Sequence, residues 1–185
     1  MNTLITAVNL AGSYLGLGRY KEAVDLNKQV LEVWKGLLGP EDERTTRVMA
    51  NLALCYNNLG QHQEALELQE QALESRKRVL GPESPDTLWI MACLAESYLR
   101  VGRSQEALEL NQRSMEGQTR VLGPEHPETL DTIYVRLLIL RKLELMDQMQ
   151  DLLQAALSAH ERALGTNHPK TMRLKKDFSA ELTLL

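Results

Sequence analysis

The residue types that most often carry out chemistry in proteins are few in this sequence and are not arranged to act together. There are two cysteines and four histidines, namely Cys55, Cys93, His62, His126, His160 and His168. Covalent catalysis needs a nucleophile, a base and a group that orients the base, and no such set can be proposed from these residues. The cysteines also lack the spacing of metal ligands. We therefore expect no catalytic residues, no metal site and no cofactor, and we interpret the chain as not being an enzyme.

Charge and composition exclude further classes of function. The formal net charge is -4 and the pI about 5.6, and no basic stripe is present, so a nucleic-acid partner is not expected. No run of about 18 apolar residues is present, so we expect no membrane partner either. The N-terminus has no basic residue before an apolar run, as a signal peptide would. Two cysteines fit a reducing compartment, and we expect a cytoplasmic protein.

The elements that must position any functional side chain follow an internal period of 42 residues. The segments Leu38-Gly39-Pro40, Leu80-Gly81-Pro82 and Leu122-Gly123-Pro124 recur at this spacing, and Leu164-Gly165-Thr166 continues it. The same step is kept by Thr3, Thr45, Thr87, Thr129 and Thr171, by Gly18, Gly60 and Gly102, and by Tyr14, Tyr56 and Tyr98. Because many positions agree on one spacing, the sequence predicts a repeat array.

Each repeat contains the pattern of two helices. In the second repeat, apolar residues recur at helical spacing over roughly residues 45–59 and again over 63–80. Gly60 permits a left-handed turn between the two helices, and Gly81 with Pro82 ends the second one. The aromatic content of only 4% favours the same all-α fold class over a β-sandwich or barrel. Small residues are expected where the paired helices cross, at Ala11/Ala23, Ala53/Ala65 and Ala95/Ala107.

The order of these residues resembles a known repeat family. The pattern Thr-Leu-x5-Leu-Ala-x2-Tyr-x3-Gly-x4-Ala-Leu-x-Leu, followed by Leu-Gly-Pro-Glu-His-Pro-Glu-Thr, is similar to the 42-residue tetratricopeptide (TPR) repeats of kinesin light chains. It is closer still to the TPR arrays that follow nucleotide-binding domains in fungal receptor-like proteins. HEAT and armadillo units share the length but not this order, and a WD40 blade needs four short strands that do not appear.

The resemblance implies a right-handed TPR superhelical solenoid of antiparallel helix pairs, and no catalytic activity. Its concave groove would bind a protein partner, as a peptide or a helix. The start at a repeat boundary indicates a fragment of a longer array or a shortened gene. By this resemblance, residues 1–185 are expected to form a single array. Its repeats are 3–44, 45–86, 87–128 and 129–170, with a partial fifth repeat or capping helix at 171–185.

The face of each first helix that lies opposite the core is expected to line the groove. Asn9 and Asn51 occupy the kinesin-light-chain position whose amide can grip an extended peptide backbone, whereas Cys93 and Val135 replace it in the next two repeats. Apolar anchors among charged neighbours are typical of binding surfaces. The candidate groove residues are Asn9, Arg47, Asn51, Leu54, Asn58, Trp89, Glu96, Arg100 and Tyr134.

Other functions were weighed against peptide binding. The two-carboxylate clamp of chaperone-binding TPR domains needs Lys, Asn and Arg at positions that hold Val8, Gly12, Trp89 and Cys93 here, so a chaperone-tail role is excluded. A structural or self-assembling segment of a larger signalling or kinesin-light-chain-like protein is the alternative, with weak end-to-end self-association as its interaction. RNA reading by helical repeats is disfavoured by the acidic balance.

Several charged and titratable residues are expected to have no role in binding. His126 and His168 lie at equivalent loop positions and are interpreted as structural, while His62 and His160 are expected to be solvated. The run Arg76-Lys77-Arg78 is interpreted as a solvated face of a second helix.

The fourth repeat departs from the pattern, because its glycine becomes Glu144 and its tyrosine becomes Leu140. After it, Leu174, Phe178 and Leu182 recur on one helical stripe, which predicts that residues 171–185 cover the apolar face of this weaker repeat.

Overall fold

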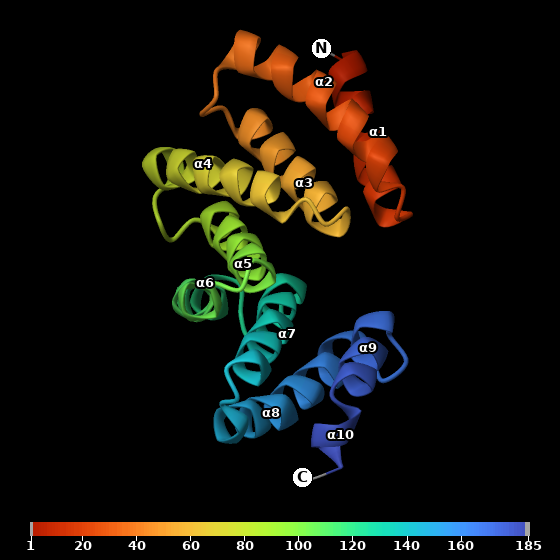
Figure 1. Ribbon diagram of the computed structural model, residues 1–185, viewed down its shortest axis with the longest axis vertical. Coiled ribbons are helices and arrows are strands. Elements are labelled where there is room, and N and C mark those ends of the chain that lie inside the picture. Colours follow the sequence, from red (N-terminus) through yellow and green to blue (C-terminus); the bar gives the residue numbers. More distant parts are fainter. Residues whose placement is uncertain (1, 184–185) are drawn as a thin grey trace.

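A computed structural model describes residues 2–183 of the chain, and in these residues it contains helices and no strand. In chain order the helices are α1 (Asn2–Gly16), α2 (Tyr20–Leu38), α3 (Glu43–Asn58), α4 (His62–Leu80), α5 (Pro85–Arg100), α6 (Ser104–Val121), α7 (Pro127–Lys142), α8 (Met146–Leu164), α9 (Pro169–Asp177) and α10 (Ser179–Leu182). Figure 1 shows them stacked as antiparallel pairs along the long axis, with the two chain ends at opposite ends of the stack. The expected all-α, right-handed solenoid is confirmed.

The turn inside each helix pair requires a left-handed backbone. Gly60 has a φ of +79°, a conformation that glycine adopts without steric cost. The fourth repeat keeps the same turn although Glu144 replaces the glycine, and Glu144 has a φ of +58°. Within residues 2–183, Glu144 is the one residue other than glycine that has a positive φ. The pairing of α7 with α8 therefore survives the loss of glycine, with some local strain.

The predicted crossing points of the helix pairs are buried. Ala23, Ala53, Ala65, Ala95 and Ala107 are fully inaccessible to solvent, and Ala11 is nearly so.

A further close contact between paired helices lies elsewhere and was missed from the sequence. A Cβ atom built on Gly117 in α6 would lie 2.4 Å from Cδ2 of Leu88 in α5. The two helices of the third repeat, α5 and α6, thus pack closely at a glycine, which has no side chain.

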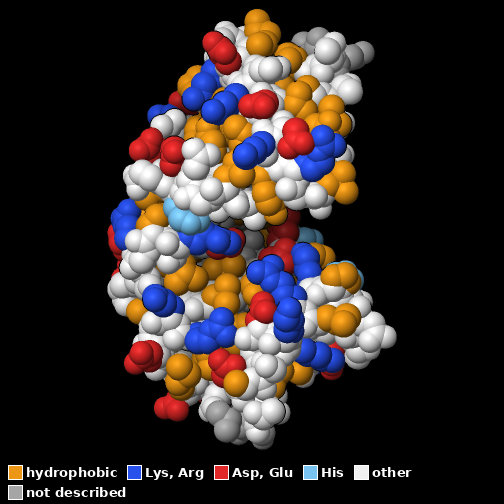
Figure 2. Space-filling view, turned by 45° about the vertical axis from the view of Figure 1, so that its right-hand side comes forward, with side chains coloured by type: hydrophobic (Ala, Val, Ile, Leu, Met, Phe, Trp, Pro, Cys, Tyr) orange, Lys and Arg blue, Asp and Glu red, His pale blue; other side chains and the backbone are white. Residues whose placement is uncertain are grey.

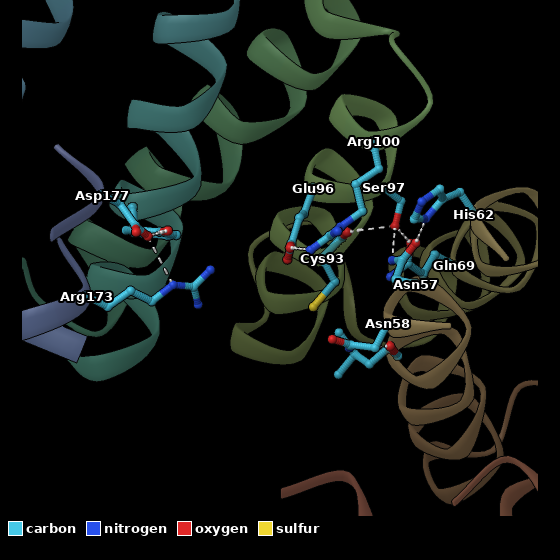
Figure 3. Close-up of polar contacts among 12 residues, drawn as sticks. Asn57, Asn58, His62, Gln69, Cys93, Glu96, Ser97, Arg100, Arg173 and Asp177 are labelled. Atoms are coloured by element: carbon cyan, nitrogen blue, oxygen red, sulfur yellow. Dashed lines mark hydrogen bonds and ion pairs between the residues drawn. The ribbon is translucent and has the colours of Figure 1, made fainter. Parts of the chain in front are cut away.

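Polar contacts lie between successive repeats as well as apolar ones. Asn57 of α3 donates a hydrogen bond from Nδ2 to Ser97 Oγ of α5 at 2.7 Å, and Ser97 in turn donates to Gln69 of α4 (Figure 3). His62 Nδ1 lies 3.2 Å from Asn57 Oδ1 and is half-buried rather than solvated. Because a buried amide is costly without partners, this network favours one arrangement of α3, α4 and α5.

Two side chains that were expected to be solvated are buried. Arg76 is 2% exposed and His160 is 1% exposed. Both occupy one repeat position that holds Trp34 in the first repeat and Gln118 in the third, and those two residues are also buried. Burial lowers the pKa of His160, whose Nδ1 lies 2.8 Å from the carbonyl oxygen of Ala156. The position faces inward in every repeat, so Arg76 is buried although Arg78 of the same basic run is exposed.

The C-terminal segment forms two short helices rather than one. The helix breaks at Phe178, which lies between α9 and α10 with φ -121° and ψ 26°. Leu174 and Phe178 are nevertheless fully buried, and Leu182 packs against the same cluster with Leu137 and Leu153. The last two residues of the expected 171–185 segment lie outside the described residues. The predicted apolar stripe covers α7 and α8, but through a bent segment.

Candidate groove for a partner

The first helices of successive repeats lie side by side and enclose a hollow of about 740 Å³, here called the central hollow. Figure 2 shows the surface hollowed at mid-height on the right, with acidic side chains at its depth. Its lining comes from α1, α3, α5, α7 and α9: Leu15, Gly16, Leu54, Trp89, Ala92, Cys93, Glu96, Glu128, Asp131, Thr132, Tyr134, Val135, Lys170 and Arg173. Side chains from repeats that are far apart in the sequence therefore line one shared space.

A second hollow of about 290 Å³, here called the arginine hollow, adjoins the central one. It lies between α3, α4 and α5, with Glu128 of α7 at its edge, and is lined by Arg47, Asn51, Arg76, Asp86, Trp89, Ile90 and Glu128. Trp89 and Glu128 line both hollows. These two side chains therefore lie at the boundary that the two hollows share.

Most of the predicted groove residues line these two spaces. Leu54, Trp89, Glu96 and Tyr134 line the central hollow, and Arg47 and Asn51 line the arginine hollow together with Trp89. The remaining three predicted residues line neither, and they are Asn9, Asn58 and Arg100.

Local contacts account for two of those three residues. Asn58 turns back on its own helix, where its Nδ2 donates to the carbonyl oxygen of Leu54 at 2.8 Å. Arg100 Nη2 pairs with Glu96 at 2.6 Å, so its charge is neutralised by a groove residue rather than offered to a ligand (Figure 3). Asn9 is exposed on α1, beyond the hollow that Leu15 and Gly16 begin.

The charges of the groove are divided into paired and unpaired groups. In the central hollow, Asp131 accepts an ion pair from Lys170 at 2.7 Å, and Glu96 is paired with Arg100. Glu128 forms no ion pair within residues 2–183, nor do Arg47 and Asp86 in the arginine hollow. Unpaired charges in a concave surface are available to a partner of opposite charge.

Cys93 lies at the floor of the central hollow but is not a reactive thiol. Burial raises the pKa of its thiol far above the usual range, and the carboxylates of Glu96, Glu128 and Asp131 raise it further. Burial also raises the pKa of Cys55 to about 11. Because the thiolate is the nucleophilic form, both side chains act as small apolar groups near neutral pH.

Helix α9 contributes to the groove, which the sequence did not indicate. Lys170 and Arg173 both line the central hollow. The Arg173 guanidinium lies 4.6 Å above the centroid of the Tyr134 ring and 3.4 Å from Asp177 Oδ2.

Two histidines position the starts of groove helices. His168 Nδ1 accepts from the Lys170 amide at 3.3 Å at the start of α9, and His126 Nδ1 accepts from the Glu128 amide at the start of α7. Both histidines are thus structural, as expected.

The sequence also failed to single out Arg76, Asp86 and Glu128. Arg76 was misread because it stands in a run of basic residues, although the repeat position it shares with Trp34 signals burial. Asp86 and Glu128 lie in the first turns of α5 and α7, where acidic residues usually stabilise the helix start. Nothing in their local pattern distinguishes a groove residue from a helix-end residue.

A further hollow of about 530 Å³ lies on the opposite side, between the second helices α4 and α6. It is lined mainly by Glu70, Glu74, Glu106 and Glu109 above a floor of Leu73, Leu94 and Leu110, with Tyr98, Lys77 and Arg113. Several of its carboxylates are already bonded: Glu74 to Lys77, Glu106 to Arg103 and Glu70 to Tyr98. Most carboxylates on this surface are therefore already bonded, unlike Glu128 and Asp86 in the groove.

Within residues 2–183, no group of three or more His, Cys, Asp or Glu side chains is placed to hold a metal ion. None of the helices in that range is both long enough and apolar enough to cross a membrane.

Comparison with known proteins identifies the repeats. A family model described as "Tetratricopeptide repeat" matches residues 2–78, 47–117 and 87–136, which together span more than half of the chain. No curated protein sequence matches the chain.

Solved structures share the whole fold. A putative kinesin light chain with nearly identical TPR-like repeats from Podosopora anserina is 27% identical, with a TM-score of 0.79 over 98% of this chain and 86% of that one. A variant of the same Podosopora anserina protein superimposes with a TM-score of 0.80 at the same identity, over 98% of this chain and 85% of that one. The repeats are therefore of the kinesin-light-chain-like type.

More distant structures share the fold alone. BtubC (BKLC) from P. vanneervenii is 19% identical with a TM-score of 0.77, covering 94% of this chain and 69% of that one. A Rap protein complexed with competence and sporulation factor is 13% identical with a TM-score of 0.75, covering 99% of this chain and 54% of that one.

Proposed function

This chain belongs to the tetratricopeptide repeat family, and on that premise we propose that it binds an extended peptide segment of a protein partner in the groove formed by α1, α3, α5, α7 and α9. Its fold is that of a protein-interaction module. The observation that carries the proposal is that the central and arginine hollows adjoin, with Trp89 and Glu128 lining both.

The composition of the groove supports a peptide as the ligand. Trp89, Leu54 and Val135 provide partly or fully buried apolar contact area, and aromatic side chains are frequent anchors at binding surfaces. The Asn51 amide carries both donors and an acceptor, which suits the backbone of an extended chain. We propose that Asn9, Asn58 and Arg100 contribute less than the other predicted residues, because they line neither hollow.

The remaining parts of the assignment follow from the same premise. We propose that the repeats are 3–44, 45–86, 87–128 and 129–170 with a partial fifth at 171–185, and that the protein acts without catalysis and without a nucleic-acid or membrane partner. The family is one of scaffolds rather than enzymes. Its two free cysteines fit a cytoplasmic site of action.

Selection from a displayed library of random peptides, followed by affinity measurement on the full chain, tests this function. The double variant Arg47→Ala/Asn51→Ala removes two groove side chains that are not in the buried core. We expect it to weaken the selected peptides by about tenfold or more, since hydrogen bonds to charged groups are the stronger ones. Its melting temperature should change by only a few degrees, because exposed substitutions usually cost less than about 0.5 kcal/mol.

A matched variant on the other face provides the control. Glu109→Ala/Arg113→Ala removes two exposed side chains from the hollow between α4 and α6. It should bind the selected peptides as the wild type does. Peptides that tolerate the Arg47→Ala/Asn51→Ala variant but are lost in the Glu109→Ala/Arg113→Ala variant would place the binding surface on the second helices and refute the proposal.

One observation favours the alternative of a self-assembling segment. Leu10 on α1 is 43% exposed, whereas the residues at the same repeat position in α3 and α5, Leu52 and Leu94, are 3% and 2% exposed. Leu10 therefore places an interior residue type at a solvent-exposed position, as a contact with a further repeat or with another copy of the chain would require.

A further inference from the structure

Arg76 carries a buried charge without an ionic partner. Its side chain is 2% exposed, and no carboxylate within residues 2–183 forms an ion pair with it. Its Nη2 donates to the carbonyl oxygen of Glu43 at 2.6 Å, while Nε and Nη1 have no hydrogen-bond partner. Buried charges in proteins are normally paired, because removing a charge from water is costly.

The rest of the array shows that the fold does not need an arginine at this position. The equivalent side chains are Trp34, Gln118 and His160, which are all buried and of which none is an arginine or lysine. A neutral residue therefore satisfies the same packing requirement in three other repeats. The hydrogen bond to Glu43 uses only Nη2 of Arg76, so the contact of α4 with α3 leaves Nε and Nη1 unexplained.

Arg76 lines the arginine hollow, beside groups that would bind the same ligand. Arg47 lines this hollow without an ion pair, and the Asn51 amide lines it as well. Two positive charges and an amide donor thus line one space of about 290 Å³. Trp89 lines the same space.

We propose that the arginine hollow is a carboxylate-binding subsite, in which Arg76 and Arg47 bind the carboxylate of a peptide partner that lies in the groove. This inference rests on the proposed function and specifies the chemistry of its ligand. A planar guanidinium matches the two oxygens of a carboxylate, so one group could satisfy donors of both arginines. The carboxylate comes from an acidic side chain or from the C-terminus of the partner.

The acidic residues of the hollow favour a carboxylate over a phosphate. Asp86 and Glu128 line the same space and are unpaired, so the two positive charges are balanced by two negative ones. A dianionic phosphate would be repelled by these carboxylates more strongly than a monoanion would. A peptide carries backbone N–H groups or a basic side chain beside its carboxylate. The carboxylate would then pair with the two arginines, and the neighbouring donors with Asp86 and Glu128.

The subsite is tested by titrating the protein with small carboxylates and control compounds, so the experiment does not depend on a known partner. The full chain is labelled with ¹⁵N, and binding is followed through the NMR signal of the Arg76 Nε–H group. This signal is assigned by its loss in Arg76→Gln. The probes are N-acetylglycine for a terminal carboxylate, N-acetylglutamic acid α-amide for a side-chain carboxylate, inorganic phosphate, and the neutral N-acetylglycinamide. Intrinsic fluorescence of Trp89, recorded in a Trp34→Phe background, gives a second readout that remains available when Arg76 is replaced.

We expect one of the two carboxylates to shift the Arg76 signal saturably at millimolar concentration, with phosphate binding at least about tenfold more weakly and the neutral amide having no effect. The better of the two carboxylates identifies the source as a side chain or a C-terminus. The absence of a saturable shift with either carboxylate, or a stronger response to phosphate, would overturn the proposal.

Substitution separates binding from a structural role. Arg76→Gln introduces the residue that occupies this position in the third repeat, and Arg78→Gln is the matched control, since Arg78 is exposed on the same helix. Arg76→Gln should abolish the carboxylate response of Trp89 while the melting temperature stays level or rises, and Arg78→Gln should change neither. An unchanged Trp89 response in folded Arg76→Gln would refute the subsite, whatever its stability.

Failure of this inference is distinguishable from failure of the proposed function. If selected peptides bind and are lost in Arg47→Ala/Asn51→Ala while the small carboxylates do not bind, only the subsite is wrong. If the carboxylates bind at Arg76 but no peptide requires the groove, the peptide-binding function is wrong.

Discussion

The Tyr134 hydroxyl of α7 donates a hydrogen bond to Asp177 Oδ2 at the end of α9, with an oxygen–oxygen distance of 2.5 Å. The Tyr134 and Phe178 rings meet edge to face, with centroids 6.2 Å apart, and Arg141 lies 4.6 Å above the Phe178 ring. Burial, and then this hydrogen bond, raise the pKa of Tyr134. A predicted groove residue is thus held in place by the C-terminal segment, which couples the shape of the central hollow to the docking of α9.

The Tyr134–Asp177 contact predicts a loss of stability in acid. The hydrogen bond from Tyr134, with Arg173 nearby, holds the pKa of Asp177 below its usual value. A carboxylate with a lowered folded-state pKa contributes stability above its unfolded value, about 3.9, and loses it as the pH falls through the folded value. Urea unfolding of the wild type and of Asp177→Asn from about pH 2.5 to 6 should show a difference above about pH 4 that shrinks below it.

The control for the acid effect is Tyr134→Phe, which removes the donor but keeps the ring. In that background Asp177→Asn should have a smaller effect, because the two side chains form one contact. A stability difference between wild type and Asp177→Asn that stays constant across that pH range would contradict this prediction.

The C-terminal segment is expected to stabilise the fourth repeat. Phe178 is fully buried against α7 and α8, so Phe178→Ala should lower the free energy of unfolding by about 3–5 kcal/mol. Met172→Ala is the control on the same segment, because Met172 is 57% exposed and its truncation should cost less than about 0.5 kcal/mol. Removal of residues 171–185 should lower the melting temperature and increase aggregation, since it uncovers an apolar face.

Hydrogen exchange measures the same effect residue by residue. Amides of residues 174–182 should be protected in the full chain, and those of α7 and α8 should exchange faster after the truncation. Exchange of 174–182 at the rate of an unfolded peptide, with α7 and α8 unaffected by the truncation, would show that the segment has no stabilising role.

Gly117 is predicted to tolerate no side chain while Leu88 is present. An added Cβ would lie 2.4 Å from Leu88 Cδ2, and Leu88 is 1% exposed, so its side chain has little room to move. Gly117→Ala should therefore lower the free energy of unfolding by about 1–3 kcal/mol through overpacking, despite the higher helix propensity of alanine. Denaturant unfolding measures the change.

A double-mutant cycle checks the cause. Leu88→Ala removes the clashing atoms, so Gly117→Ala should be less harmful in the Leu88→Ala background than in the wild type. Equal costs in the two backgrounds would mean that the contact between Gly117 and Leu88 is not the reason. The comparison is made between differences, so the large cost of Leu88→Ala itself does not enter.

Self-association through α1 would depend on Leu10 and Leu17, which are 43% and 73% exposed. If the end of the array associates with another copy, the average mass in analytical ultracentrifugation should rise with concentration, and Leu10→Gln/Leu17→Gln should abolish the rise. Leu37→Gln is the control, because Leu37 is also 73% exposed but lies on α2. A concentration-independent monomer mass for the wild type would rule out this mode of assembly.

Particular residues show why parts of the fold could be predicted and others could not. Ala53 and Ala65 were identified as crossing points because a repeated small residue is a direct consequence of close helix packing, and both are buried. Gly117 gave no such signal, because it occurs once and one glycine inside a helix has several explanations. Glu144 broke the glycine pattern, yet its backbone keeps the left-handed turn with φ +58°, because the packing of α7 and α8 outweighs the local cost.

The misread residues were charged or titratable ones. Arg76 and His160 were assigned to solvent from their type and their neighbours in the sequence, whereas both are buried. Residue type reports the average cost of burial, but the repeat position decides which side of the helix faces the core. Comparing the four equivalents Trp34, Arg76, Gln118 and His160 would have corrected the assignment, because a tryptophan at this position favours the interior.

The sequence by itself determined the repeat length, the all-α fold and the helix pairs, because these depend on local periodicity and on glycines and prolines at fixed steps. Only the tertiary structure decided which side chains share a space: Arg76 beside Arg47, Glu128 between two hollows, and α9 against Tyr134. The physical reason is that the curvature of a solenoid sums small rotations between successive repeats. These accumulated rotations bring together side chains that are far apart in the sequence, and they cannot be deduced from a local sequence pattern.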